Sequence, residues 1–150
     1  MPAGQRIDPY INSRFLVEID GIQTIEFTEV IIPDAFVNVI EYRSGADLPG
    51  FRKLPGQICY SDITLKWGVT KNHELCDWWE MVRQGHTQAA RKNMAIVLKD
   101  EQSNDVMRWT FSNCWPVRYH PSALVAEGND AFINTMVITH EGMQLDWPMR

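Results

Sequence analysis

The chain has 150 residues, of which 45% are hydrophobic, so it can bury one sizeable core and a single domain, residues 1–150, is expected. Lys and Arg total 14 against 19 Asp and Glu, and the net charge of -5 argues against a protein that grips nucleic acid by neutralising phosphates. No apolar run approaches the ~20 residues of a membrane span, and no signal peptide is recognisable. The three cysteines are scattered, which indicates a cytosolic protein with reduced thiols.

The first part of the chain alternates between apolar and polar residues, which predicts β-strands. Residues 14–20 alternate, Asp20-Gly21 is a hairpin signal, and residues 24–30 alternate again. We therefore predict an opening β-hairpin. Pro33-Asp34 interrupts the pattern, and residues 37–42 resume it.

A long segment between Tyr42 and Ser61 has little periodicity of its own. Connections longer than about 12 to 15 residues in a compact domain are usually functional or disordered. A solvated linker would lack the apolar residues that this segment contains, which are Leu48, Phe51, Leu54, Ile58 and Tyr60. We expect a loop that packs onto another surface, such as a second copy of the protein.

After a strand predicted at residues 62–67, the hydrophobic period changes from two to 3.6. One apolar stripe predicts a short helix over residues 72–83: Leu75, Trp78, Trp79 and Val82. Asn72 or Thr70 can cap its start, and Gly85 can terminate it. Two indoles could stack on a ligand, but a tryptophan pair on an amphipathic stripe is more often a lid over a sheet or barrel end. We expect this helix to be the only one.

The second half of the chain predicts further antiparallel strands. Residues 94–100 and 106–113 alternate on either side of a polar turn, which indicates a second hairpin. Pro116 and Pro121 are expected to frame a short edge segment, because proline cannot donate to a central ladder. The last strand, residues 131–141, is expected to be the longest in the chain.

The candidate catalytic groups form no recognisable constellation. The four histidines are His73, His86, His120 and His140, and no pair among them has metal-ligand spacing. The chain has neither a CxxC motif nor a phosphate-binding loop. Cys76 lies near a helix start, where a thiolate could be stabilised, but such a cysteine usually packs as a small hydrophobe. His140-Glu141-Gly142 is interpreted as a turn. We therefore predict no enzyme activity, no metal site and no cofactor.

Several stretches, in order along nearly the whole chain, carry a family resemblance: RFLVEIDG, EYRSGAD followed by RKLPG, DITLKWGVT leading into ELCDWW, RWTFSNCWPVRY and INTMVITHEGMQL. The most distinctive are the RKLPG segment, residues 52–56, and His140-Glu141-Gly142. Together these stretches resemble the tail tube protein family of contractile phages and of phage-derived contractile injection systems.

The resemblance implies a structural protein with a mainly β fold, an antiparallel β-barrel or sandwich with one short α-helix and a long docking loop. It implies hexameric rings stacked into a hollow inner tube, with sheath, baseplate and tube-cap proteins as partners and with cargo or DNA passing through the lumen. Such a particle would be made and assembled in the bacterial cytoplasm. Whether the particle is a phage tail or an injection system stays open.

In the family, the loop after the third strand reaches the adjacent ring. By this resemblance, the corresponding loop here is residues 44–56. The expected contacts within that loop are Leu48, Phe51, Arg52, Lys53 and Leu54. Because side chains alternate along strands, one polar set is expected to face the lumen, namely Thr24, Glu26 and Thr28. A second set is less clearly placed and consists of Asp62, Thr64 and Lys66.

Two alternatives remain beside the tube subunit. One is a tube-end or baseplate-adjacent ring protein. The other is a small-ligand-binding β-barrel, which would need an apolar inner face rather than the polar one just described. Two positions depart from the family pattern, namely the apolar run at residues 30–32 and Trp67, and either could mark a contact peculiar to this system.

Overall fold

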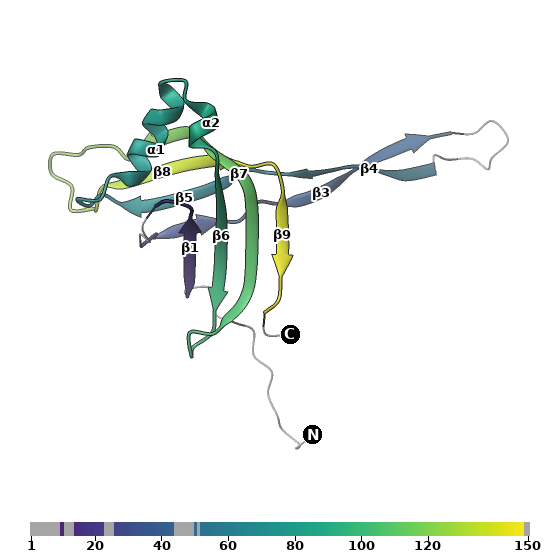
Figure 1. The fold of residues 1–150 in the computed structure, drawn as a ribbon, viewed down its shortest axis with the longest axis horizontal. Helices are drawn as coiled ribbons and strands as arrows, with labels where there is room; N and C mark the ends of the chain where they lie inside the picture. The colour runs from purple at the N-terminus through teal and green to yellow at the C-terminus, as the bar shows by residue number, and fades with distance from the viewer. Residues whose placement is uncertain (1–9, 11–13, 23–25, 44–49, 51, 149–150) are drawn as a thin grey trace, which may run out of the picture.

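The structure is a computed structural model that describes residues 10, 14–22, 26–43, 50 and 52–148 (Figure 1). Within those residues the elements follow in this order: β1 (Phe15–Ile19), β2 (Glu29–Ile31), β3 (Ala35–Tyr42), β4 (Arg52–Tyr60), β5 (Ile63–Gly68), α1 (Glu74–Arg83), α2 (Thr87–Ala90), β6 (Lys92–Lys99), β7 (Asp105–Pro121), β8 (Ile133–Thr139) and β9 (Met143–Asp146). The predicted mainly antiparallel β fold is confirmed.

Strand β7 belongs to two sheets at once. Its first part pairs with β6 on one side and β9 on the other, and its last part pairs with β8. We call β1, β6, the first part of β7 and β9 the first sheet, and the last part of β7 with β8, β5 and β2 the second sheet. The two sheets share one strand, and their inner faces enclose the core.

The core forms where the alternation of both sheets points inward. In the second sheet every other residue of β5 is buried: Ile63, Leu65 and Trp67. In the first sheet the inward residues include Val17, Ile96 and Phe111, which lie on three neighbouring strands. The period-two pattern of the sequence therefore selects the buried face of β1, β5 and β8, whereas the middle of β6 is buried on both faces.

Helix α1 covers one end of the two sheets, as the lid interpretation expected (Figure 1). Trp78 is buried, and its indole N–H donates to the backbone carbonyl of Ala90. Asn72 accepts the backbone N–H of Glu74 at 2.9 Å, and Gly85 follows the last turn with a φ of 88°. A left-handed residue at this position favours glycine. The expectation of a single helix was wrong, because α2 follows at once.

The predicted opening hairpin was wrong. Strand β1 pairs with β6 and β2 pairs with β5, and among the described residues the Asp20-Gly21 turn is followed only by an isolated bridge from Ile19 to Ile22. Long-range pairing is favoured here because the middle of β6, residues 94–97, is buried on both faces and offers β1 a partner within the core. Strand β2 begins only at Glu29, so residues 26–28 are not part of a strand.

The last part of the chain also differs from the prediction. Strand β7 has 17 residues and is longer than β8, which has 7. It continues through Pro116 and ends at Pro121, and the part between these prolines pairs with β8 alone, so the expected edge segment is present as the end of a longer strand. Pro116 is fully buried beside a register shift, and such irregularities are where a paired strand accommodates proline. The predicted turn at His140 lies between β8 and β9.

Candidate assembly surfaces

Strands β3 and β4 form a two-stranded ribbon that extends away from both sheets (Figure 1). We call this ribbon the arm. Every residue of β3 is exposed, and so are most residues of β4. A two-stranded hairpin with no sheet behind it is marginally stable in water. The arm is therefore the element of this fold that most needs a partner surface.

The arm continues the ladder of the second sheet. Strands β2 and β5 end their pairing at Ile31 and Thr64, and β3 and β4 begin theirs at Ala35 and Tyr60. The same number of residues separates the two pairs on each strand, so the register passes through the junction unchanged. The arm is thus an outward extension of one wall of the core.

The junction is closed by Asp34 and Ser61. The backbone N–H of Ser61 donates to the carbonyl oxygen of Asp34 at 3.0 Å, and the backbone N–H of Asp34 donates to the Ser61 hydroxyl at 2.7 Å. Both bonds run between the two strands of the arm. We call this pair of residues the arm root.

Apolar side chains lie on both faces of the arm. On one face, Val37 lies opposite Ile58, and on the other, Ile40 lies opposite Leu54. Their exposed fractions are 45% and 58% for the first pair and 50% and 47% for the second. Exposed apolar surface that is continuous over one element is typical of protein–protein contact sites.

A bulge in β4 requires glycine at position 56. The register shifts between Val37 and Val39, where β4 carries one more residue than β3. A Cβ atom at Gly56 would lie 2.8 Å from the carbonyl oxygen of Asn38 and 3.2 Å from Ile40. The backbones therefore approach too closely for a side chain, which accounts for the glycine within the RKLPG segment.

The expectation of a docking loop over residues 44–56 needs correction, because residues 52–56 are strand. The side chains of Arg52, Lys53 and Leu54 are exposed on β4, opposite Tyr42, Glu41 and Ile40 of β3. Leu48 and Phe51 lie outside the described residues. That the segment contacts an adjacent ring stays a prediction.

Sequence reasoning missed the apolar residues of β3 as contact candidates, among them Phe36, which is 52% exposed. Proline and glycine at positions 55 and 56 hid β4, the strand that contains them. The apolar residues Leu54, Ile58 and Tyr60, spaced by four and two positions, were the signal that could have revealed this strand.

The outer face of the second sheet carries two of the lumen candidates. Register places Thr64 beside Ile31 and Lys66 beside Glu29, and the ammonium of Lys66 lies 3.2 Å from the Glu29 carboxylate. Asp62 precedes β5 and is exposed. This face is polar but also carries apolar residues of β2 and β8.

The other lumen candidates lie elsewhere. Glu26 and Thr28 are exposed before β2, and Thr28 donates from both its backbone N–H and its hydroxyl to the carbonyl oxygen of Lys66. Thr24 lies outside the described residues. The assignment of any of these residues to a lumen stays a prediction.

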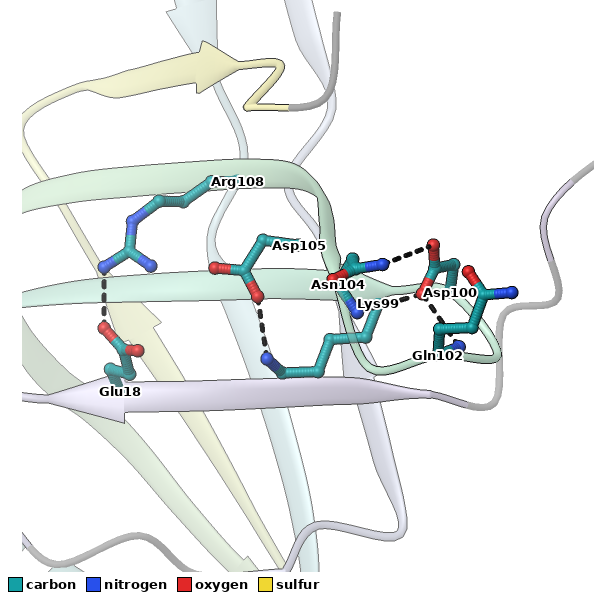
Figure 2. A network of polar contacts seen from close by, with 7 residues as sticks. All are labelled: Glu18, Lys99, Asp100, Gln102, Asn104, Asp105 and Arg108. Atoms are coloured by element: carbon teal, nitrogen blue, oxygen red, sulfur yellow. Dashed lines mark hydrogen bonds and ion pairs between the residues drawn. The ribbon is translucent and has the colours of Figure 1, made fainter.

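The outer face of the first sheet holds a groove of about 650 Å³ lined by polar and apolar residues from β1, β6, β7 and β9. Figure 2 shows the ion pair that crosses it, in which Arg108 of β7 contacts the Glu18 carboxylate of β1 at 2.6 Å. Lys99 and Asp105 join β6 to β7 at 2.7 Å. Partly exposed pairs of this kind contribute up to about 1 kcal/mol each.

The β6–β7 turn is held by Asp100 (Figure 2). Its carboxylate accepts the backbone N–H groups of Asn104 and Gln102 at 2.9 Å each. The bond from Asn104 is the main cause that holds the pKa of Asp100 below its usual value. Backbone donors favour a charged carboxylate, so the turn keeps its geometry at neutral pH.

Among the described residues, no group of three or more His, Cys, Asp or Glu side chains could hold a metal ion. In the same part of the chain, no helix is long and apolar enough to cross a membrane. The surfaces described above are a ribbon and two sheet faces.

Comparison with known proteins gives a consistent result. Residues 11–144 match the family described as T4-like virus tail tube protein gp19. A chain from the extracellular contractile injection system PVC sheath–tube complex in the extended state is 28% identical, with a TM-score of 0.81, and 93% of this chain and 92% of that chain are covered. A search of the curated proteins gave no match.

Two further solved structures share the fold. A chain from the anti-feeding prophage (AFP) baseplate is 24% identical with a TM-score of 0.84, covering 97% of this chain and 100% of that chain. Hcp1 from Salmonella typhimurium is 12% identical with a TM-score of 0.63, covering 90% and 86%.

Proposed function

Because the chain belongs to the family of T4-like virus tail tube proteins, we propose that it assembles into hexameric rings that stack into the hollow inner tube of a contractile tail or injection particle. The chain is a tail tube subunit and a component of such a particle. Its role is structural rather than catalytic. The observation that carries the proposal is the arm, whose apolar side chains are exposed on both of its faces.

Ring closure would use the free edges of the sheets. Strands at sheet edges present unpaired N–H and C=O groups that favour pairing with another chain, and a head-to-tail contact of this kind closes into a ring. Stacking of rings would then bury the arm on an adjacent copy. Sheath and tube-cap partners are part of the proposal, because similar chains come from a sheath–tube complex and from a tube-terminating cap. Cargo or DNA would pass through the lumen.

A tube-end ring is the second candidate. Similar folds occur in a chain from the AFP baseplate and in a chain from the AFP tube-terminating cap, at TM-scores of 0.84 and 0.83. A tube-end protein would form single rings, whereas a main tube subunit would form tubes of many rings. Negative-stain microscopy of the purified protein distinguishes the two.

The test replaces two exposed apolar side chains of the arm by β-branched polar ones, Val39→Thr together with Ile58→Thr. Threonine keeps the β-branched shape, so the arm should still form. Losing two buried apolar groups at the docked arm would cost roughly 2 kcal/mol and raise the critical concentration for stacking about thirtyfold. Sedimentation velocity measures the critical concentration, and urea unfolding of the monomer should be unchanged.

Val125→Thr is the matched control, because Val125 is 68% exposed but lies in the connection between β7 and β8. It should assemble like the unaltered protein. If the unaltered protein remains monomeric at every concentration, with sheath and baseplate components present as well, the tube role is wrong.

A further inference from the structure

We propose that His140 is the positioning residue that fixes the arm to the body of the protein, by a latch between the β8–β9 turn and the arm root. This inference rests on the proposed function, because it assigns the residue that orients the arm for docking. The latch consists of one imidazole ring, the carbonyl group of Ser61 and the backbone N–H of Gly142.

The two ring nitrogens of His140 have different partners. Nδ1 accepts the backbone N–H of Gly142 at 3.2 Å. A nitrogen that accepts cannot carry the proton in a neutral ring, so Nε2 carries it and donates to the Ser61 carbonyl oxygen at 2.9 Å. The backbone of the turn therefore sets the tautomer that binds the arm root.

The turn itself is firmly held to β7. Ser112 accepts the backbone N–H of Glu141 at 2.9 Å and donates its own to the carbonyl oxygen of Gly142 at 3.3 Å. The Glu141 carboxylate accepts from the side-chain amide of Asn113 at 2.8 Å and also pairs with Arg91. His140 thus projects from an anchored platform.

The arm root is the other end of the latch. Ser61 uses its N–H and its hydroxyl to join the two strands of the arm through Asp34, which leaves its carbonyl oxygen for His140. The ring also contacts aromatic side chains from both parts, with centroids 5.7 Å from Tyr60 of β4 and 5.1 Å from Phe111 of β7. One residue therefore contacts the arm, the core and the turn.

A pair of substitutions separates the two hydrogen bonds. In His140→Asn the short amide can occupy the position of Nδ1 and still accept from Gly142, but it cannot reach Ser61. In His140→Gln the longer amide can occupy the position of Nε2 and still donate to the Ser61 carbonyl. Both variants lose the ring contacts, so they are matched controls for each other.

The first readout is amide hydrogen exchange in the monomer, measured by mass spectrometry. In His140→Asn, exchange of the Asp34 and Ser61 amides should rise about fivefold, while β6 and the first part of β7 stay unchanged. In His140→Gln the rise should be less than half as large. Unchanged exchange at the arm root in His140→Asn would overturn the latch, and so would equal rises in the two variants.

The second readout is assembly, measured as the critical concentration for stacking by sedimentation. His140→Asn should raise it about fivefold, and His140→Gln should largely restore it. If exchange at the arm root rises in His140→Asn but stacking is unaffected, the latch stands and the docking role of the arm is wrong. The two failures are therefore distinguishable.

Discussion

Glu141 shows how single side chains tie distant strands of this fold together. Its carboxylate contacts Arg91, just before β6, and the amide of Asn113 in β7. The bond from Arg91, followed by that from Asn113, holds the pKa of Glu141 below its usual value of 4.5. The stabilisation is therefore present above about pH 4.5 and is lost as the pH falls through the lowered pKa in the folded state.

Cys114 should be inert toward alkylation in the folded protein. It is fully buried, and burial raises the pKa of its thiol from 9.0 to about 12. Because only the thiolate reacts, the shift alone should slow its alkylation at pH 8 about a thousandfold relative to the unfolded chain. Cys59, which is partly exposed, serves as the internal control. Peptide mass spectrometry after brief iodoacetamide treatment measures both, and comparable labelling of the two would contradict the burial of Cys114.

Among the elements, the arm depends on one backbone irregularity. The bulge at Gly56 shifts the pairing of β3 with β4 by one residue, and the two strands pair on both sides of this shift. Apolar side chains lie on both faces of the resulting arm. Pro55 sits beside the bulge and lies opposite Val39. A ribbon without a third strand tolerates a proline that cannot donate, which a central strand would not.

Gly56→Ala should disrupt the arm without unfolding the core. The new Cβ would lie 2.8 Å from the Asn38 carbonyl oxygen, which is backbone and cannot move aside. The expected cost is about 1 to 3 kcal/mol, confined to the arm. Hydrogen exchange should rise along β3 and β4 while β6 and β7 stay protected. Gly68→Ala is the control, because no atom lies within 4 Å of its Cβ position. Equal effects of the two changes would place the constraint elsewhere.

The sequence predicts elements with strong periodicity far better than it predicts their partners. β5, α1 and the first part of β7 follow from alternation or from a helical stripe within a few residues. The pairing of β1 with β6 does not, because a local hairpin signal competes with a buried partner more than 70 positions away. The arm could not be predicted because Pro55 and Gly56 are typical of loops but lie here within a strand.

At the scale of the whole molecule, two polar sheet faces are candidates for the wall of the lumen. The outer face of the second sheet includes Thr64 and Lys66, and the outer face of the first includes Thr110 beside the groove. We propose that the second sheet faces the lumen, because the arm continues its ladder and would carry that wall toward the next ring. The residues before β2 would then lie at the rim.

Thr64→Cys in assembled tubes should react with a small maleimide at least about tenfold faster than with a maleimide linked to a bulky polymer. The channel admits the small reagent only, whereas an outer wall admits both. Thr110→Cys on the first sheet is the matched control, since both threonines are half-buried strand residues. Cys59 and Cys76 are replaced by Ser beforehand. Equal rates of the two reagents at Thr64→Cys would place the second sheet outside.

Because the register passes unchanged from the β2–β5 pair into the β3–β4 pair at the arm root, the length of the arm sets how far it extends from the core. Each residue pair adds about 3.3 Å to its reach and a fixed increment of right-handed twist. Deleting one pair would shorten the reach by that amount and exchange the side chains on the two faces, whereas deleting two pairs would restore the faces at a reach shorter by roughly 7 Å. If the arm contacts the next ring as proposed, the spacing and angular offset between successive rings would depend on the number of paired residues from Ala35 to Tyr42.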